Sequence, residues 1–165
     1  MNALQTVTIE YRPPLPEDLI LRAAFADARS AEFDHLEEPL RSRLIDLQLT
    51  AQQVHYRAAY PSAVDRIIVS EGQSAGRLLV ELGPVEWVLV DIAILREHRG
   101  RGVGSAVLAE LCNDADAAGL AIRLRVLSRE PSLSRWYGRF GFHREGTSGA
   151  HLVLVRPPHS ERSLS

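Results

Sequence analysis

Residues 87–111, WVLVDIAILREHRGRGVGSAVLAEL, constrain the fold more than any other part of the sequence. A nearly continuous apolar run at 87–95 predicts a buried strand, and a basic segment at 96–99 follows it. Glycines then stand at positions 100, 102 and 104, ahead of a pattern typical of an amphipathic helix. The stretch therefore predicts a strand that passes through a glycine-rich loop into a helix.

This strand–loop–helix unit favours an anionic ligand. Glycine tolerates positive φ and lets a ligand approach the backbone closely, while the first N–H groups of a helix lack intrahelical partners. Together with the positive end of the helix dipole, these groups suit a phosphate, and Arg99 and Arg101 add charged donors. The loop is therefore a candidate site for a pyrophosphate, with an ordinary strand-to-helix turn as the alternative.

Two common phosphate-binding loops do not match this spacing. The P-loop requires a lysine after its last glycine, and the whole sequence contains no lysine. The dinucleotide fingerprint requires G-x-G-x-x-G, whereas residues 100–104 read G-x-G-x-G. Neither pattern therefore fits this loop.

Composition narrows the class of protein further. The chain has 165 residues and a formal net charge of -2, which argues against a nucleic-acid partner. Its single cysteine, Cys112, excludes an internal disulfide and favours a reducing compartment. No apolar stretch is long enough to span a membrane, and the N-terminus lacks a signal-peptide pattern. We therefore expect a cytoplasmic protein that does not interact with membranes.

Periodicity ahead of the central stretch predicts a strand at 7–11, a helix at 17–28, a polar loop at 29–39 and a second helix at 40–58. The loop is interpreted as a solvated turn, with a lid over an acceptor site as the alternative. The buried face of the second helix is assigned to its apolar positions (Leu40, Leu44, Leu47, Ala51, Val54 and Ala58), and its polar face (Gln48, Gln52, Gln53, His55 and Tyr56) to water or to a substrate pocket.

The remaining segments complete an α+β pattern with a mixed sheet. We expect a hairpin of strands 66–69 and 77–81 around a turn at 71–76, a helix at 103–118 and a strand at 122–127. Pro131 opens another helix that ends at Gly141, and strands at 142–144 and 151–155 form a terminal hairpin. Residues 1–156 are predicted to form a single domain, and 157–165 a disordered tail.

Two motifs and the order of elements resemble the GNAT superfamily of acyl-CoA-dependent N-acyltransferases. Residues 99–104, RGRGVG, are similar to the family's pyrophosphate loop, [Q/R]-x-x-G-x-[G/A]. Residues 136–142, WYGRFGF, are similar to its Y-x-x-x-G-F motif. The resemblance implies the GNAT fold, with about four helices and a mostly antiparallel sheet that contains a central, splayed parallel pair.

The resemblance also implies how coenzyme A would bind. The main chain of Ile92, Ala93 and Ile94 would pair with the pantetheine arm, as an added strand does. The pyrophosphate would be held by the loop and the first turn of the helix, which consist of Arg99, Gly100, Arg101, Gly102, Val103, Gly104 and Ser105.

Acyl transfer to an amine needs a base and a proton donor for the departing thiolate. Tyr137 matches the family's donor tyrosine. Asp91 interrupts an apolar strand and is the first candidate for the base, acting through a water, with Glu86 as the second. The alternatives are no dedicated base, or a histidine such as His35 or His151. Glu130 stands where the family often has asparagine, a departure that leaves the tyrosine in place.

The sequence therefore predicts an N-acetyltransferase that moves an acetyl group from acetyl-CoA to a primary amine by direct transfer. The alternative is a non-catalytic acyl-CoA-binding regulatory module. The acceptor would be a small-molecule or peptide amine, a homodimer is compatible with the sequence, and no metal is expected because the histidines lack ligand spacing.

Overall fold

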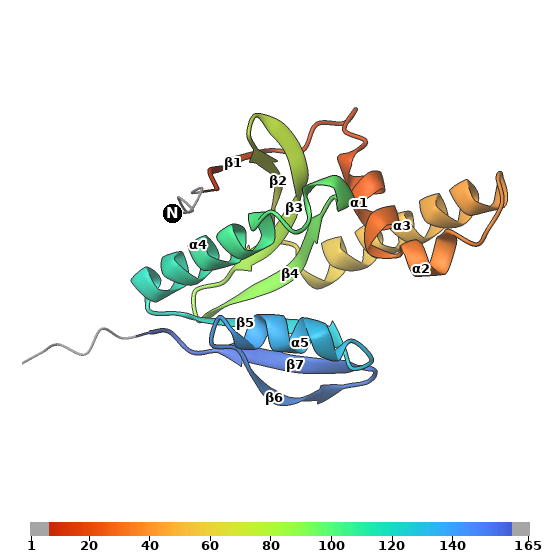
Figure 1. Cartoon of the computed structure of the whole chain (residues 1–165). Helices are drawn as coiled ribbons and strands as arrows, with labels where there is room; N and C mark the ends of the chain where they lie inside the picture. Colours follow the sequence, from red (N-terminus) through yellow and green to blue (C-terminus); the bar gives the residue numbers. More distant parts are fainter. Residues whose placement is uncertain (1–6, 160–165) are drawn as a thin grey trace, which may run out of the picture. The chain divides into compact units, whose positions relative to one another are not determined.

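The computed structural model describes residues 7–159. Within them the chain forms a seven-stranded mixed sheet in the order β1-β2-β3-β4-β5-β7-β6 (Figure 1). β4 and β5 are parallel, whereas β1–β2, β5–β7 and β6–β7 are antiparallel. The predicted α+β class with one parallel pair is confirmed. The strands are β1 Ile9–Arg12, β2 Ala63–Ser70, β3 Gln73–Leu82, β4 Glu86–Ile94, β5 Ala121–Leu127, β6 His143–Ser148 and β7 His151–Arg156.

Contacts divide the chain into two compact units. The first contains the described residues up to Leu79 together with residues 91–106, and the second contains residues 80–90 and those from 107 onward. The described helices are α1 Ile20–Ala28, α2 Ser30–Phe33, α3 Leu40–Ala59, α4 Val103–Ala118 and α5 Pro131–Gly138, with a short 3₁₀ helix, η1, at Arg96–His98. No helix among residues 7–159 has the length and apolar character needed to cross a bilayer.

The first unit buries two apolar clusters. Ile20 and Ala24 of α1 pack with Ile67 of β2 and with Leu95. The second cluster consists of Phe25, Phe33 and Ile45. Phe33 is only 2% exposed, which explains why the predicted loop at 29–39 contains the short helix α2: burying this ring requires an ordered backbone on either side of it.

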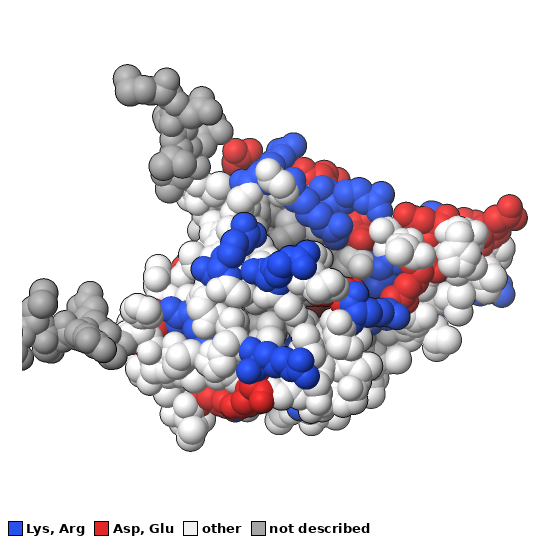
Figure 2. All heavy atoms as spheres, turned by 60° about the horizontal axis from the view of Figure 1, so that its bottom comes forward, with Lys and Arg blue, Asp and Glu red and all other residues white. Residues whose placement is uncertain are grey.

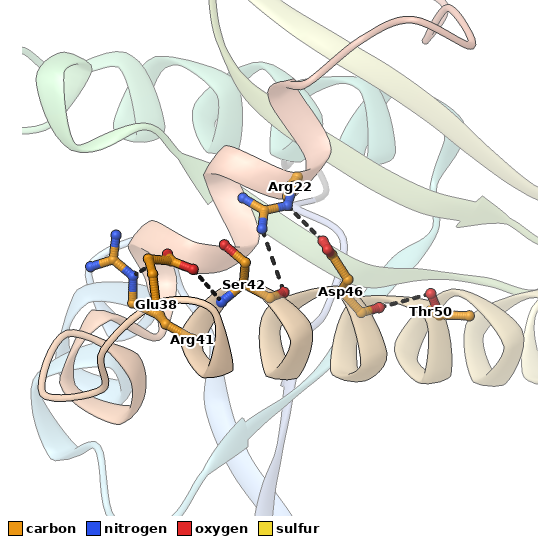
Figure 3. A network of polar contacts seen from close by, with 6 residues as sticks. All are labelled: Arg22, Glu38, Arg41, Ser42, Asp46 and Thr50. Atoms are coloured by element: carbon orange, nitrogen blue, oxygen red, sulfur yellow. Dashed lines mark hydrogen bonds and ion pairs between the residues drawn. The ribbon is translucent and has the colours of Figure 1, made fainter.

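Polar contacts join α1 to α3 within the first unit (Figure 3). Arg22 Nε donates to Asp46 Oδ1 at 2.6 Å, and Arg22 Nη2 donates to the Ser42 carbonyl at 3.5 Å. At the start of α3, the Glu38 carboxylate accepts from the Ser42 N–H at 3.3 Å. The carboxylate thus satisfies one of the free donors in the first turn of the helix.

The buried face of α3 differs from the predicted one. Leu40, Leu47 and Val54 are 53%, 66% and 61% exposed, whereas Ile45 is buried. Gln53 and Tyr56, which the sequence had placed on a polar face, turn inward instead. The prediction was wrong because it counted apolar residues, whereas the inward side of this helix packs partly against polar groups that lie on strands.

Two boundaries in the first unit also differ from the sequence prediction. α1 begins at Ile20 because Asp18 is held in the preceding turn, where its carboxylate accepts from Arg12 Nη2 at 2.7 Å. The β2–β3 hairpin closes through Glu71 and Gly72 alone, both with positive φ, so the predicted six-residue turn at 71–76 was too long. Two consecutive residues with positive φ are the pattern of a tight hairpin turn.

The second unit contains most of α4, together with β5, α5, β6 and β7. Ile122, Leu124 and Val126 of β5 are buried, so alternate residues of this strand face the core. An ion pair links β7 to α4: Arg156 of β7 donates two hydrogen bonds of 2.7 Å to Asp116 of α4. Of the predicted tail, residues 157–159 form neither helix nor strand, and residues 160–165 lie outside the described part of the chain.

Candidate active site

The glycine loop and the first turn of α4 lie in the first unit. Gly100 and Gly102 have φ of +71° and +81°, a backbone region that side chains rarely allow. α4 begins directly after the loop at Val103, and the Ala106 N–H donates to the Gly102 carbonyl at 2.9 Å. Within residues 7–159, no backbone acceptor is recorded for the N–H groups of residues 100–105. These donors, at the positive end of a helix, form a cradle suited to an anion.

The two arginines of the loop are arranged differently. Arg99 Nε donates to the Ile94 carbonyl at 2.9 Å and so ties the loop back to the end of β4. Both Arg99 and Arg101 are exposed, so they can place positive charge near an anion bound by the loop. Since the chain has no lysine, every blue side chain in Figure 2 is an arginine.

The C-terminal part of β4 runs beyond its ladder with β5. The register of that parallel pair extends from Glu86 and Ala121 to Leu89 and Leu124, and residues 92–94 lie past its recorded end. Gly76 of β3 makes a close approach to this segment possible, because a Cβ at Gly76 would lie 2.1 Å from the Ala93 carbonyl oxygen. The Ile94 carbonyl already accepts a hydrogen bond from Arg99, so it is less available to a ligand than the carbonyl of an unengaged strand residue.

Asp91 lies at the start of this segment, beside a buried arginine. Its Oδ2 is 3.6 Å from Arg77 Nη1, and a quarter of its side chain stays exposed. Burial raises the pKa of the Asp91 carboxyl, an effect that the Arg77 charge opposes and the Asp65 charge reinforces. A raised pKa is what a carboxylate needs to act as a base toward an amine.

Arg77 organises this cluster, although the sequence pattern did not single it out as a site residue. Its side chain is 4% exposed, and it donates to Asp65 through Nε at 3.0 Å and Nη2 at 2.8 Å. Nη2 also lies 3.4 Å from Gln53 Oε1. A single charged residue within an otherwise apolar strand was the signal that identified Asp91, and Arg77, followed by Leu78, Leu79 and Val80, carries the same signal.

The other two candidate catalytic residues belong to the second unit. Tyr137 is 5% exposed, and its ring makes edge contacts with Trp136 and Phe142 at centroid distances of 4.8 and 5.5 Å. Both carboxylate oxygens of Glu86 accept from Arg123 Nε, at 3.0 and 3.1 Å. Glu86 is therefore committed to an ion pair.

Of the predicted site residues, Asp91, the main chain of 92–94 and the loop at 99–105 share the first unit, and Glu86 and Tyr137 share the second. At position 130, the Glu130 carbonyl accepts a hydrogen bond from the Leu133 N–H at 3.2 Å. A backbone carbonyl, and not a side-chain amide, is therefore the acceptor at the start of α5. Across residues 7–159 there is no group of three or more His, Cys, Asp or Glu side chains that could hold a metal ion.

Comparisons with known proteins identify the family and the fold. A family model described as an acetyltransferase (GNAT) domain matches residues 63–144. Comparison with curated protein sequences finds no match. Many solved structures share the fold, and one is the PaiA N-acetyltransferase of Thermoplasma acidophilum in complex with coenzyme A. It is 16% identical with a TM-score of 0.66, over 91% of this chain and 99% of that one.

Two further structures show the same fold. An acetyltransferase from Thermus thermophilus is 22% identical with a TM-score of 0.64, over 91% of this chain and 97% of that one. The ribosomal-protein-S18-alanine N-acetyltransferase of Escherichia coli is 15% identical with a TM-score of 0.59, over 96% of this chain and 99% of that one. The predicted fold is thereby confirmed.

Proposed function

Because the chain belongs to the GNAT superfamily of acyltransferases, we propose that it transfers an acetyl group from acetyl-CoA to a primary amine by direct transfer. The observation that carries this proposal is the cradle of N–H groups at residues 100–105, which opens at the N-terminus of α4. That the similar protein from Thermoplasma acidophilum binds coenzyme A supports the choice of donor.

The residues present fit coenzyme A as a substrate. The positive φ values of Gly100 and Gly102 hold the loop open to a pyrophosphate, and Arg99 and Arg101 supply charge at its rim. The main chain of Ile92, Ala93 and Ile94 is the proposed partner of the pantetheine arm. Its position past the end of the β4–β5 ladder supports this role, since backbone groups on that side of the strand need a partner other than β5.

In the proposed reaction the amine nitrogen attacks the thioester carbonyl, a C–N bond forms and the C–S bond breaks. Asp91 accepts the proton that the amine loses, through a water molecule, and Tyr137 donates a proton to the departing thiolate. A phenol keeps its own proton at neutral pH, which suits it to this role. Asp91 is preferred over Glu86 because both oxygens of Glu86 are occupied by Arg123.

The experiment that tests this function is a thiol-release assay with acetyl-CoA and a panel of primary amines. We expect release of free CoA that depends on the amine, together with an acetylated product of matching mass. The chain has no lysine of its own, so acetylation of internal lysines cannot add to the signal.

Tyr137→Phe and Asp91→Asn are the variants to compare with the unaltered chain. Each should lower turnover by about 10²-fold or more while CoA still binds. Binding of CoA without thiol release from any amine would support the non-catalytic module instead. The absence of both binding and release would contradict acyl transfer altogether.

A further inference from the structure

A cavity of about 270 Å³ lies within the first unit, at the C-terminal end of α3. Its wall is formed by the end of α3, by the residues that follow the helix and by facing positions of β2 and β3. The volume far exceeds the ~30 Å³ that one water occupies in the liquid, and it is close to the lower limit for small-molecule pockets. The cavity can therefore hold a compact organic molecule.

The residues that line this cavity carry one net positive charge. Its charged members are Arg57, Arg77 and Asp65. Arg77 and Asp65 compensate each other, because Arg77 donates to Asp65 through Nε at 3.0 Å and through Nη2 at 2.8 Å. Arg57 is exposed, and within residues 7–159 its side chain has neither an ion pair nor a hydrogen bond. The charge of Arg57 is thus the one that a ligand can neutralise.

The lining also contains a donor that lacks an acceptor. Gln53 Oε1 accepts from Arg77 Nη2 at 3.4 Å, whereas its buried Nε2 has no hydrogen-bond partner among the described residues. Tyr56 lines the cavity as well, and burial raises the pKa of its phenol to about 12, so the hydroxyl keeps its proton at neutral pH. A ligand that satisfies these donors must bring acceptor oxygens.

The positive charge and the donors lie on one face of α3. Gln53 and Arg57 are four residues apart, so their side chains are neighbours on the helix surface. An amide N–H and a guanidinium one turn apart can bind the two oxygens of one carboxylate. The remaining lining is apolar or aromatic (Tyr60, Pro61, Ala63 and Leu79). This wall suits an anionic group attached to an apolar body.

Charges outside the lining do not reverse this balance. Asp91 and Arg29 do not line the cavity, yet the charges of both act on Tyr56. Since the two are opposite in sign, neither sign dominates beyond the lining. A monoanion fits the wall best, because one positive charge of the lining remains uncompensated.

We propose that this cavity binds a compact organic monocarboxylate. Its oxygens accept from Arg57 and from Gln53 Nε2, and its apolar body packs on the ring of Tyr60. The site is independent of the proposed acyl transfer, because no residue of the loop at 99–105 lines the cavity. The carboxylate belongs either to the amine acceptor or to a separate effector, and both present the same group to Arg57.

The test is calorimetric titration of the chain with benzoate, benzyl alcohol and benzylamine. The three probes share a ring and differ in charge at neutral pH. Benzoate should bind saturably, and benzyl alcohol should bind about tenfold more weakly because it cannot neutralise Arg57. Benzylamine should bind more weakly still, since it brings a second cation to the cavity. No saturable binding of benzoate, or binding of benzylamine as tight as that of benzoate, would overturn the proposal.

Arg57→Gln should raise the Kd for benzoate about tenfold and leave the Kd for CoA unchanged. Arg43→Gln is the matched control, because Arg43 is an exposed arginine of the same helix that does not line the cavity. It should bind benzoate as the unaltered chain does. Benzoate binding that survives Arg57→Gln would place the anion elsewhere, such as at residues 100–105, and would overturn the proposal.

A kinetic comparison distinguishes the two sources of the carboxylate, and this part alone depends on the proposed acyl transfer. 4-(Aminomethyl)benzoate carries an amine and a carboxylate, whereas benzylamine carries the amine alone. If the acceptor supplies the carboxylate, 4-(aminomethyl)benzoate should have a KM about tenfold lower, and Arg57→Gln should remove that advantage. Equal KM values with benzoate still bound would assign the site to an effector. Benzoate binding without CoA binding would contradict the acyl transfer and leave the carboxylate site in place.

Discussion

Arg77 is the residue on which the chemistry of the candidate site most depends. Its guanidinium makes two hydrogen bonds to Asp65 and a longer contact of 3.6 Å to Asp91, so the two carboxylates share it unequally. The charge of Arg29 also acts on Asp91 and lowers the pKa of its carboxyl. Asp65 therefore raises the pKa of Asp91 in two ways, by its own negative charge and by occupying the arginine.

Asp65→Asn should lower the pKa of Asp91. The substitution removes the negative charge of Asp65, and the Arg77 guanidinium can then interact more strongly with the Asp91 carboxylate. Since Asp91 must be deprotonated to accept a proton, the acid limb of the kcat profile should move to lower pH. The titration of Asp91 can be followed by ¹³C NMR of its carboxyl carbon, with Asp91→Asn identifying the signal. A pKa that stays the same or rises in Asp65→Asn would contradict this account.

The sequence was sufficient to single out Asp91 but not its partners. A carboxylate in an apolar strand must be compensated, and this argument holds without coordinates. Which residue compensates it depends on which side chains of β2, β3 and α3 meet, and no local pattern specifies that. The pattern places Tyr56 and Gln53 on a polar side of their helix, yet only the structure shows that they line a cavity.

At the scale of elements, the loop between β4 and α4 is the feature that the sequence predicted best. α4 spans Val103–Ala118, as expected, because glycines with positive φ precede and follow it. The faces of α3 were predicted wrongly, since its exposed leucines have the same spacing as a buried stripe.

Gly102→Glu should abolish CoA binding, because it strains a backbone with φ of +81° and adds negative charge at the cradle. Gly119→Glu is a matched control: Gly119 has φ of +68°, follows the other end of α4 and would meet no atom within 4 Å. A calorimetric Kd for CoA should be measured for both variants. Normal CoA binding by Gly102→Glu, or equal loss in both variants, would count against the assigned loop.

The ion pair between α4 and β7 should make stability depend on pH. Arg156 lowers the pKa of Asp116 from 3.8 to about 2, so the pair stabilises the fold above the unfolded pKa. This contribution is about 2 kcal/mol and is lost as the pH falls toward the folded pKa. Asp116→Asn should therefore lower the free energy of unfolding at pH 7 by about that amount, and the difference should disappear near pH 2.

The measurement is urea unfolding of the two chains across this pH range. Asp114→Asn is the control, because Asp114 is an exposed acid on the same helix, and a change within about 0.5 kcal/mol is expected. A deficit of Asp116→Asn that persists unchanged at low pH would show that the pair does not act through the charge of Asp116.

At the scale of the whole molecule, the order of elements and two short motifs were enough to predict the fold. The motifs stand in a fixed order and flank β5, and such a combination rarely arises by chance. The cavity at the end of α3 could not be predicted in this way, because its lining depends on which side chains of α3, β2 and β3 meet in the fold.

Binding of CoA should stabilise the whole chain. A ligand at a hundred times its Kd adds about 2.7 kcal/mol to the native state, which corresponds to a rise in Tm of about 5–10 °C for a chain of this size. ATP or NAD at the same concentration should raise Tm less, because each lacks the pantetheine arm. A larger rise with either nucleotide would favour a different nucleotide-binding protein.

The central claim is that the backbone N–H groups of residues 100–105 bind the pyrophosphate of coenzyme A. It is tested most directly by titrating the ¹⁵N-labelled chain with CoA and following the backbone amide resonances by NMR. We predict saturable shifts that are largest at Gly100, Gly102 and the first turn of α4. Saturable shifts confined to other parts of the chain, with these amides unmoved, would contradict the account.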